Sequence, residues 1–297
     1  MREIKYNKNF KIITVIDPGA DDFDFIENEF KIERNDLEEF KMPYHLSDYD
    51  VRTKYSFLVI SFPKEKNFLK EALEIENVYF FFSNTFFICL SKGESLVNKI
   101  IDDILDDPKI SLPNTEKLLY YILKSLLKVY YSILRTIDHE INFLDKNINK
   151  LPPQILNQRI VFLKKNLILF LTNTKSFYEV FEEIVKNRMP NFRRYSHLWE
   201  GFLDEVNYIY VRLEDYQLII DGYQRSIENI LSININKNIL LITLIQTLFL
   251  PPTLIASIYG MNVNLPLAHK NYAFYLILFF MFFISILFWL LLIKKKG

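Results

Sequence analysis

Apolar residues are concentrated in two long uncharged runs near the C-terminal end of the chain. The first run covers residues 239–258 and the second covers residues 272–293. A helix needs about 20 consecutive apolar residues to cross the hydrocarbon core of a bilayer, and core helices of soluble proteins rarely reach that length without a charge. The pattern therefore predicts two transmembrane helices, joined by a short loop over residues 259–271.

Basic residues flank the two runs unevenly. Three lysines lie in the tail at residues 294–297 and Lys237 precedes the first run, whereas the loop between the runs has only Lys270 and His269. Because lysine and arginine accumulate on the cytoplasmic side of membrane proteins, both termini are predicted to face the cytoplasm. The charged N-terminus lacks the apolar segment of a secretory signal, so we expect a multi-pass protein of the cell (inner or plasma) membrane.

Polar side chains in the first run follow one face of a helix, at about 100° per residue. The residues on this stripe are Asn236, Ile239, Thr243, Gln246, Thr247, Leu250, Thr253 and Ser257. Several copies of such a helix around an axis could line a pore, but small polar residues are also common in helix-packing seams. The mid-membrane amide of Gln246 favours pore lining, because it needs water or a partner. The second run has little polar content beyond Ser285.

Two adjacent prolines, Pro251 and Pro252, lie inside the first run. A proline removes a backbone donor and bends a helix, and membrane helices tolerate this where neighbouring groups satisfy the freed carbonyls. A local kink is therefore predicted, either as a simple packing feature or as a gating hinge.

The N-terminal part, residues 1–112, reads as a mixed α/β domain. Short runs rich in aromatic and β-branched residues predict strands, and acid-rich amphipathic stretches predict helices. The predicted strands are 10–16, 55–62, 78–83 and 86–91, and the predicted helices are 22–30, 35–40 and 94–105. We expect an α+β cytoplasmic domain in which helices cover a mixed sheet.

Residues 113–238 read as long cytoplasmic helices. Two are predicted at 114–149 and 154–187, and each ends near a proline-containing break. A third starts near Ser196 and meets no proline before Pro251. If it continues through the first run to residue 258, it spans about 90 Å, which is typical of a stalk that links a cytoplasmic domain to a membrane segment.

Composition excludes several classes of function. The 297 residues carry 36 basic and 36 acidic side chains, and this balance gives no indication of nucleic-acid binding, which is typical of a basic domain or stripe. The single cysteine, Cys89, cannot form an internal disulfide and is expected to be a buried residue in a strand. The histidines are scattered, and the sequence has none of the common catalytic or phosphate-binding motifs. We therefore expect no enzyme and no organic cofactor.

Acidic residues form two clusters, Asp102–Asp107 and Glu200–Glu205. Such clusters are usually solvated helix faces. A sensor for a divalent cation is the alternative, because hard cations prefer oxygen ligands.

The segment directly after the first run is Tyr259-Gly260-Met261-Asn262. The order of a long helix, an apolar span, this motif, a short loop, a second span and a basic tail resembles the CorA family of magnesium and cobalt channels. The signature of that family is Gly-Met-Asn at this place. The resemblance is sharp over residues 236–262 and architectural over the rest of the chain.

This resemblance implies a homopentamer with a funnel-shaped cytoplasmic part, which admits Mg²⁺ or a similar ion such as Co²⁺ or Ni²⁺ into the cytoplasm. It implies a selectivity filter of Gly260, Met261 and Asn262, in which a ring of Asn262 oxygens binds largely hydrated Mg²⁺ and Gly260 permits a backbone bend. The pore-lining residues that it implies are Asn236, Ile239, Ile242, Gln246, Leu250, Thr253 and Ser257. Ile242 and Leu250 would form the hydrophobic constriction that blocks ions by dewetting.

Gating in this family is by intracellular Mg²⁺ held between protomers, so Mg²⁺ would be both the transported and the regulatory ion. Asp204 is the candidate regulatory ligand here. The chain departs from the family pattern at Gly201, where a sensing aspartate is expected, and in the loop after Asn262, which has no acidic residue.

Two other functions remain open. A Zn²⁺ transporter of the same superfamily would share the architecture, although Met261 favours the magnesium branch. A membrane-anchored sensor that conducts no ions would need neither the polar stripe nor Asn262.

Overall fold

The computed structural model describes residues 2–7, 9–42, 46–64, 72–93, 95–187, 192–262 and 272–294. The chain divides into two compact units, Met1–Arg225 and Ser226–Gly297. The strands are β1 (Arg2–Tyr6), β2 (Lys11–Ile16), β3 (Asp48–Val51), β4 (Ser56–Pro63), β5 (Ile75–Phe82) and β6 (Phe86–Ser91). The helices are α1 (Ala20–Phe30), α2 (Arg34–Glu38), the 3₁₀ turn η1 (Glu39–Lys41), α3 (Leu96–Asp106), α4 (Thr115–Asn147), α5 (Pro153–Lys186), α6 (Ser196–Tyr259) and α7 (Ala273–Lys294).

The N-terminal unit is built on a six-stranded sheet with the order β1-β2-β6-β5-β4-β3. The β2–β6 pair is parallel and the other pairs are antiparallel. The expected mixed sheet is therefore confirmed, and β2, β4, β5 and β6 correspond to the four predicted strands. The central strands β4 and β6 are buried along their whole length, which explains why their sequences are continuous apolar runs.

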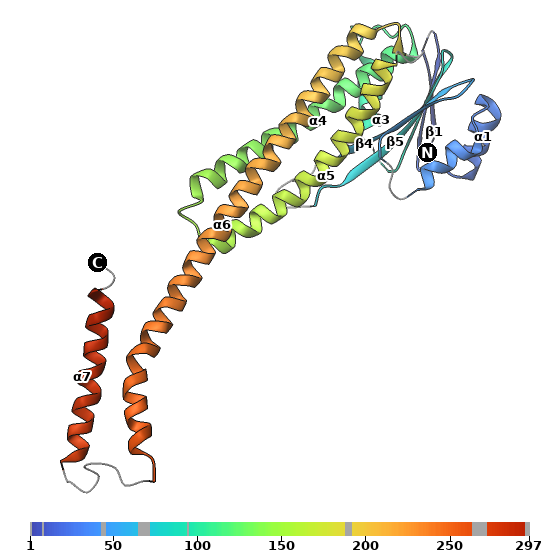
Figure 1. Ribbon diagram of the computed structural model, residues 1–297. Coiled ribbons are helices and arrows are strands. Elements are labelled where there is room, and N and C mark those ends of the chain that lie inside the picture. Colours follow the sequence, from blue (N-terminus) through green and yellow to red (C-terminus); the bar gives the residue numbers. More distant parts are fainter. Residues whose placement is uncertain are drawn as a thin grey trace. The chain divides into compact units, whose positions relative to one another are not determined.

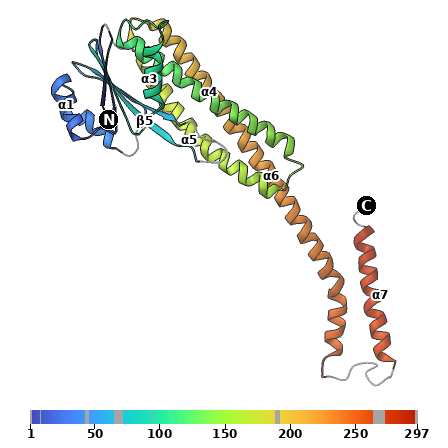
Figure 2. The same cartoon turned by 180° about the vertical axis from the view of Figure 1, so that it is seen from behind.

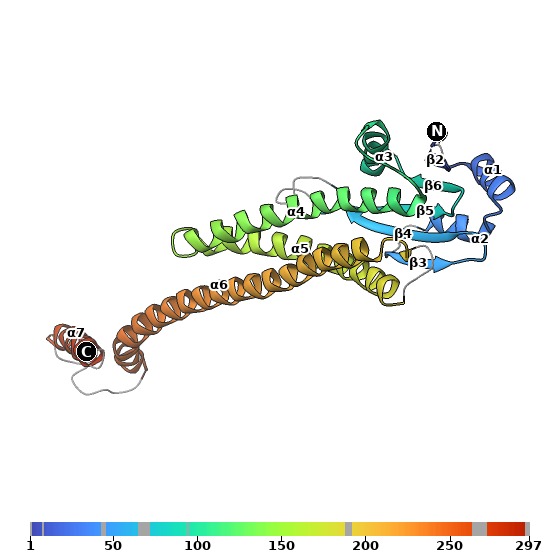
Figure 3. The ribbon, with the colours of Figure 1, turned by 90° about the horizontal axis from the view of Figure 1, so that it is seen from above.

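Helices cover both faces of this sheet (Figures 1 and 3). On one face, α1 and α2 pack Phe23 and Leu37 into a core with sheet residues such as Phe57 and Phe81, whose rings stack 4.7 Å apart. The other face carries Cys89, which is fully buried in β6 as expected. Burial raises the pKa of the Cys89 thiol.

Three long helices follow the sheet, and in the N-terminal unit α4, α5 and the first part of α6 lie side by side (Figure 2). Asn114 is the N-cap of α4, as predicted, because its side-chain oxygen accepts a hydrogen bond from the Lys117 amide at 3.1 Å. Buried Glu116 joins α4 to α6 by accepting a hydrogen bond of 3.0 Å from the indole of Trp199. The α6 helix is 64 residues long, about 96 Å, which confirms the long helix expected from the sequence.

A buried carboxyl lies on the sheet face that packs against α3. Glu76 of β5 is 5% exposed, and one of its carboxyl oxygens has no hydrogen-bond partner among the described residues. Burial raises the pKa of Glu76, and a hydrogen bond with Ser95 offsets part of this effect. The folded state therefore binds this proton more tightly than the unfolded chain does.

This burial makes stability depend on pH. Because the pKa of Glu76 is raised in the folded state, binding of its proton stabilises the fold at low pH. This contribution to the free energy of unfolding is lost as the pH rises from about 4.5, the ordinary pKa, through the pKa of the folded state. The loss is at most about 1.4 kcal/mol per pH unit. We expect Glu76→Gln to remove this decline, so that its thermal unfolding temperature exceeds the wild-type value by a margin that grows as the pH rises above about 4.5. Exposed Glu74→Gln is the matched control, and an equal pH dependence in wild type and Glu76→Gln would contradict the expectation.

Candidate functional site

The candidate ion pathway lies on the C-terminal half of α6. Every predicted lining residue between Asn236 and Ser257 belongs to this helix, and spacings of three and four residues keep them on one face over about 32 Å. All of these side chains are exposed in the single chain. Gln246, Leu250, Thr253 and Ser257 line one shallow groove, together with Phe249 and Leu254. The structure thus brings four predicted residues to one surface, while their role in a pore remains a prediction.

Within the described residues, α6 is the helix that is long and apolar enough to cross a membrane, and none of the residues in its most apolar 18-residue segment is buried. Helix α7 has 22 residues and coincides with the second predicted run. Its described apolar stretch, Phe274–Leu287, is shorter than the segment needed to span a membrane. Its assignment as a second span therefore stays a prediction.

Threonine hydroxyls on α6 are bonded back to the helix. Thr243 donates to the carbonyl of Ile239 at 2.9 Å, and Thr253 donates to the carbonyl of Phe249 at 2.7 Å. Each hydroxyl has one proton, so these oxygens are left with lone pairs that can only accept. Such a surface suits a hydrated cation, whose water shell presents hydrogen-bond donors.

The Gly260-Met261-Asn262 segment begins where α6 ends. The Gly260 amide still donates to the Ala256 carbonyl at 2.9 Å, and the Met261 amide closes a tighter turn on the Ile258 carbonyl at 3.2 Å. Asn262 is the last described residue before the rest of the predicted loop, residues 263–271, which lies outside the described residues.

The expected role of Gly260 in permitting a backbone bend stays a prediction. Among the described glycines only Gly93 has a positive φ, so the helix end does not require glycine for a left-handed conformation. A side chain at Gly260 would instead place its Cβ 3.3 Å from the Ala256 carbonyl oxygen. The absence of a side chain therefore matters for close packing against the last helical turn.

The candidate regulatory residue, Asp204, lies in the N-terminal unit on the first part of α6, and its side chain is exposed. Its neighbour Glu205 forms an ion pair with Lys124 of α4. In the other acidic cluster, Asp102 pairs with Lys5 at 2.5 Å. Within the described part of one chain, no three His, Cys, Asp or Glu side chains come together as a metal site, and the regulatory role of Asp204 stays a prediction.

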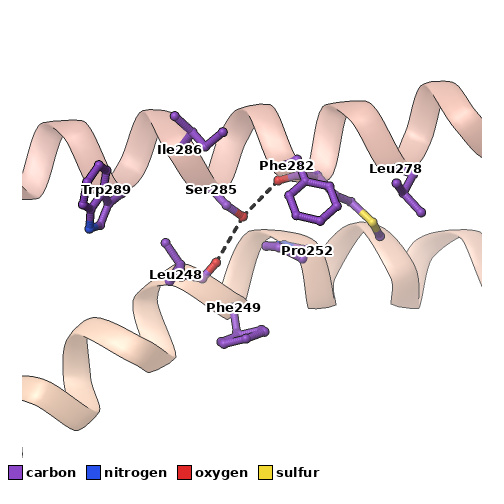
Figure 4. A pocket seen from close by; sticks show the side chains of 9 residues that line it. Leu248, Phe249, Pro252, Leu278, Phe282, Ser285, Ile286 and Trp289 are labelled. Atoms are coloured by element: carbon purple, nitrogen blue, oxygen red, sulfur yellow. Dashed lines mark hydrogen bonds between the residues drawn. The ribbon is translucent and has the colours of Figure 1, made fainter.

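The opposite side of α6 faces α7. Leu248 and Pro252 of α6 and Leu278, Phe282 and Trp289 of α7 line an apolar cavity between the two helices (Figure 4). The Ser285 hydroxyl lies in this cavity, 3.2 Å from the carbonyl oxygen of Leu248. Sequence reasoning did not predict this contact, although two signals were present, namely the prolines in the first run and the isolated serine in the second.

Comparison with known proteins gives one consistent result. The family described as "CorA-like Mg2+ transporter protein" matches residues 7–295 of this chain. The solved structure of the CorA magnesium transporter from Methanocaldococcus jannaschii superposes with a TM-score of 0.79 and covers 100% of this chain and 94% of that chain. At 18% identity, this likeness concerns the fold.

Two curated relatives are similar in sequence. The cobalt/magnesium transport protein CorA of Thermotoga maritima is 26% identical over 219 residues, which is 70% of this chain but only 60% of the relative's length. The magnesium transport protein CorA of Campylobacter jejuni is 26% identical over 318 aligned residues, covering 98% of this chain and 91% of the relative.

Proposed function

The chain belongs to the CorA-like Mg²⁺ transporter family, and from this membership we propose that it forms a divalent-cation channel that admits Mg²⁺ into the cytoplasm. The observation that carries the proposal is the exposed face of α6, which leads to the Gly260-Met261-Asn262 segment at the end of the helix. Co²⁺ and Ni²⁺ are further candidate ions. The activity is transport and involves no catalytic residue.

The pathway requires several copies of α6, because one helix cannot enclose a pore. We propose a homopentamer in the cell membrane, with α6 around the axis, α7 as the second span and both termini in the cytoplasm. The exposure of apolar side chains such as Ile239, Ile242 and Leu250 in the single chain supports association, because such surfaces are normally covered by a partner or by lipid.

Ions would meet three environments along this pathway. At the outer end, Asn262 side-chain oxygens would accept hydrogen bonds from the water shell of Mg²⁺, which gives up its water reluctantly. Thr253, Ser257 and Gln246 would continue a polar path. Apolar rings of Leu250 and Ile242 would exclude water, and with it the ion, when the pore is narrow.

Regulation by intracellular Mg²⁺ is the remaining part of the proposal. Bound Mg²⁺ would hold carboxylates of neighbouring protomers together and favour a closed state, as a ligand does when it binds one of two conformations more tightly. Exposed Asp204 is the candidate ligand on this chain.

The proposal is tested by ion entry into proteoliposomes that contain a Mg²⁺-sensitive dye and little internal Mg²⁺. We expect rapid entry of Mg²⁺ down its gradient, with Zn²⁺ measured in parallel on the same preparation. Entry of Zn²⁺ without Mg²⁺ would assign the protein to zinc transport. No flux of either ion, from folded oligomeric protein, would refute transport and leave a non-conducting sensor.

A further inference from the structure

The second proline of α6 leaves one carbonyl group without its helical partner. In an α-helix each amide donates to the carbonyl four residues earlier, so the amide of residue 252 would serve Leu248. Pro252 has no N–H to donate. In apolar surroundings an unpaired carbonyl is costly, and the Leu248 carbonyl borders a cavity lined almost entirely by apolar side chains.

Ser285 of α7 lies beside this carbonyl. Its hydroxyl oxygen is 3.2 Å from the Leu248 carbonyl oxygen and 2.9 Å from the carbonyl oxygen of Met281, one turn earlier in α7. Figure 4 shows the hydroxyl between the two helices, with one dashed line to each. The hydroxyl has a single proton, so the two carbonyls share it or compete for it.

We propose that Ser285 is a positioning residue, whose hydroxyl replaces the amide that Pro252 lacks and thereby attaches α7 to α6 at the proline pair. When the proton is directed to Leu248, the two helices are joined at this level. When it is directed to Met281, the serine is satisfied within α7 and the contact is released. Ser285 and Pro252 thus act together, because the proline frees the Leu248 carbonyl and the serine hydroxyl can bind it.

This attachment acts close to the candidate pathway without belonging to it. Leu250 lies two residues from Leu248, on the opposite side of α6, and Thr253 directly follows the proline pair. A bond that holds the Leu248 carbonyl therefore also holds the orientation of the pathway face on either side of the proline pair. This consequence rests on the proposed function, whereas the bond itself does not.

The test is a double-mutant cycle on the full-length protein in lipid nanodiscs, with thermal unfolding as the readout. Ser285→Ala is expected to lower the unfolding temperature by about 2–4 °C, the size typical of one interhelical hydrogen bond. Pro252→Ala restores an amide that can serve Leu248. In that background the effect of Ser285→Ala should fall to about 1 °C or less, within the scatter of additive sites.

Pro251→Ala is the matched control, because its new amide would serve Thr247 and leave Leu248 dependent on Ser285. The full effect of Ser285→Ala should therefore persist in that background. If Ser285→Ala does not fold, the isosteric pair Ser285→Thr and Ser285→Val isolates the hydroxyl in the same three backgrounds. An equal effect of the serine substitution with Pro252 and with Pro252→Ala would overturn the proposal, because the serine would then act by packing alone.

The consequence for the pathway has a separate readout. In proteoliposomes, Ser285→Ala should shift the internal Mg²⁺ concentration that half-closes the channel by about threefold, the equivalent of one such hydrogen bond, and Pro252→Ala should abolish this shift. An unchanged midpoint with intact thermal coupling would overturn the positioning of the pathway. If the wild type transports no ion, the thermal cycle still decides whether the bond exists, so the two failures remain distinguishable.

Discussion

Replacing Asn262 with alanine is expected to lower the initial rate of Mg²⁺ entry into proteoliposomes at least about tenfold. In the proposed channel the asparagine oxygens accept hydrogen bonds from the hydrated ion. A hydrogen bond that involves a charged group contributes about 1.5–3 kcal/mol, and about 1.4 kcal/mol corresponds to a factor of ten. Because every protomer would contribute the same oxygen, one substitution removes the whole ring.

The control is Asn149→Ala, which removes an exposed asparagine beyond the end of α4, in the N-terminal unit. This variant should transport at the wild-type rate, and both variants should elute as oligomers of the wild-type size. Wild-type entry through Asn262→Ala would contradict the role given to the Gly260-Met261-Asn262 segment, even if the protein is a channel.

Replacing Leu250 with asparagine is expected to open the proposed constriction. An apolar ring excludes ions because water leaves it, and amide groups would allow water to remain. In liposomes preloaded with saturating Mg²⁺, which should close the wild type, we expect entry of Co²⁺ to rise at least about tenfold, a change in the barrier of only about 1.4 kcal/mol. Quenching of an enclosed dye by Co²⁺ measures this leak.

Leu250→Val provides the comparison, because it keeps the ring apolar and should remain closed under the same conditions. If Leu250 faced lipid, its replacement by asparagine would lower thermal stability without any leak, since a polar amide would be exposed to hydrocarbon. That result would move the pathway to another face of α6.

Most secondary structure could be predicted from the sequence because the buried elements have strong patterns. β4 and β6 are buried on both faces and read as unbroken apolar runs. β1 and β3 were not predicted, because they are edge strands with mostly exposed, charged residues. Their conformation depends on pairing with β2 and β4, and this pairing is not encoded in their own sequences.

The residues of the candidate site also fall into those that the sequence predicts and those that depend on contacts between elements. Residues on one face of α6 could be grouped from spacing alone, because helical periodicity fixes which side chains share a face. The contact between Ser285 and Leu248 could not be predicted, since it joins residues of two different helices that are 37 positions apart in sequence. The close approach of Gly260 to the Ala256 carbonyl could not be predicted either, because it depends on how the helix ends.

The buried thiol in β6 has a practical consequence for labelling. Cys89 is the only cysteine in the chain and is fully buried, and its raised pKa keeps it in the unreactive thiol form at neutral pH. Maleimide and methanethiosulfonate reagents should therefore leave the native protein unmodified. A cysteine introduced at an exposed position such as Leu250 or Asn262 would be the one reactive thiol, so its accessibility could be followed without first removing a native cysteine.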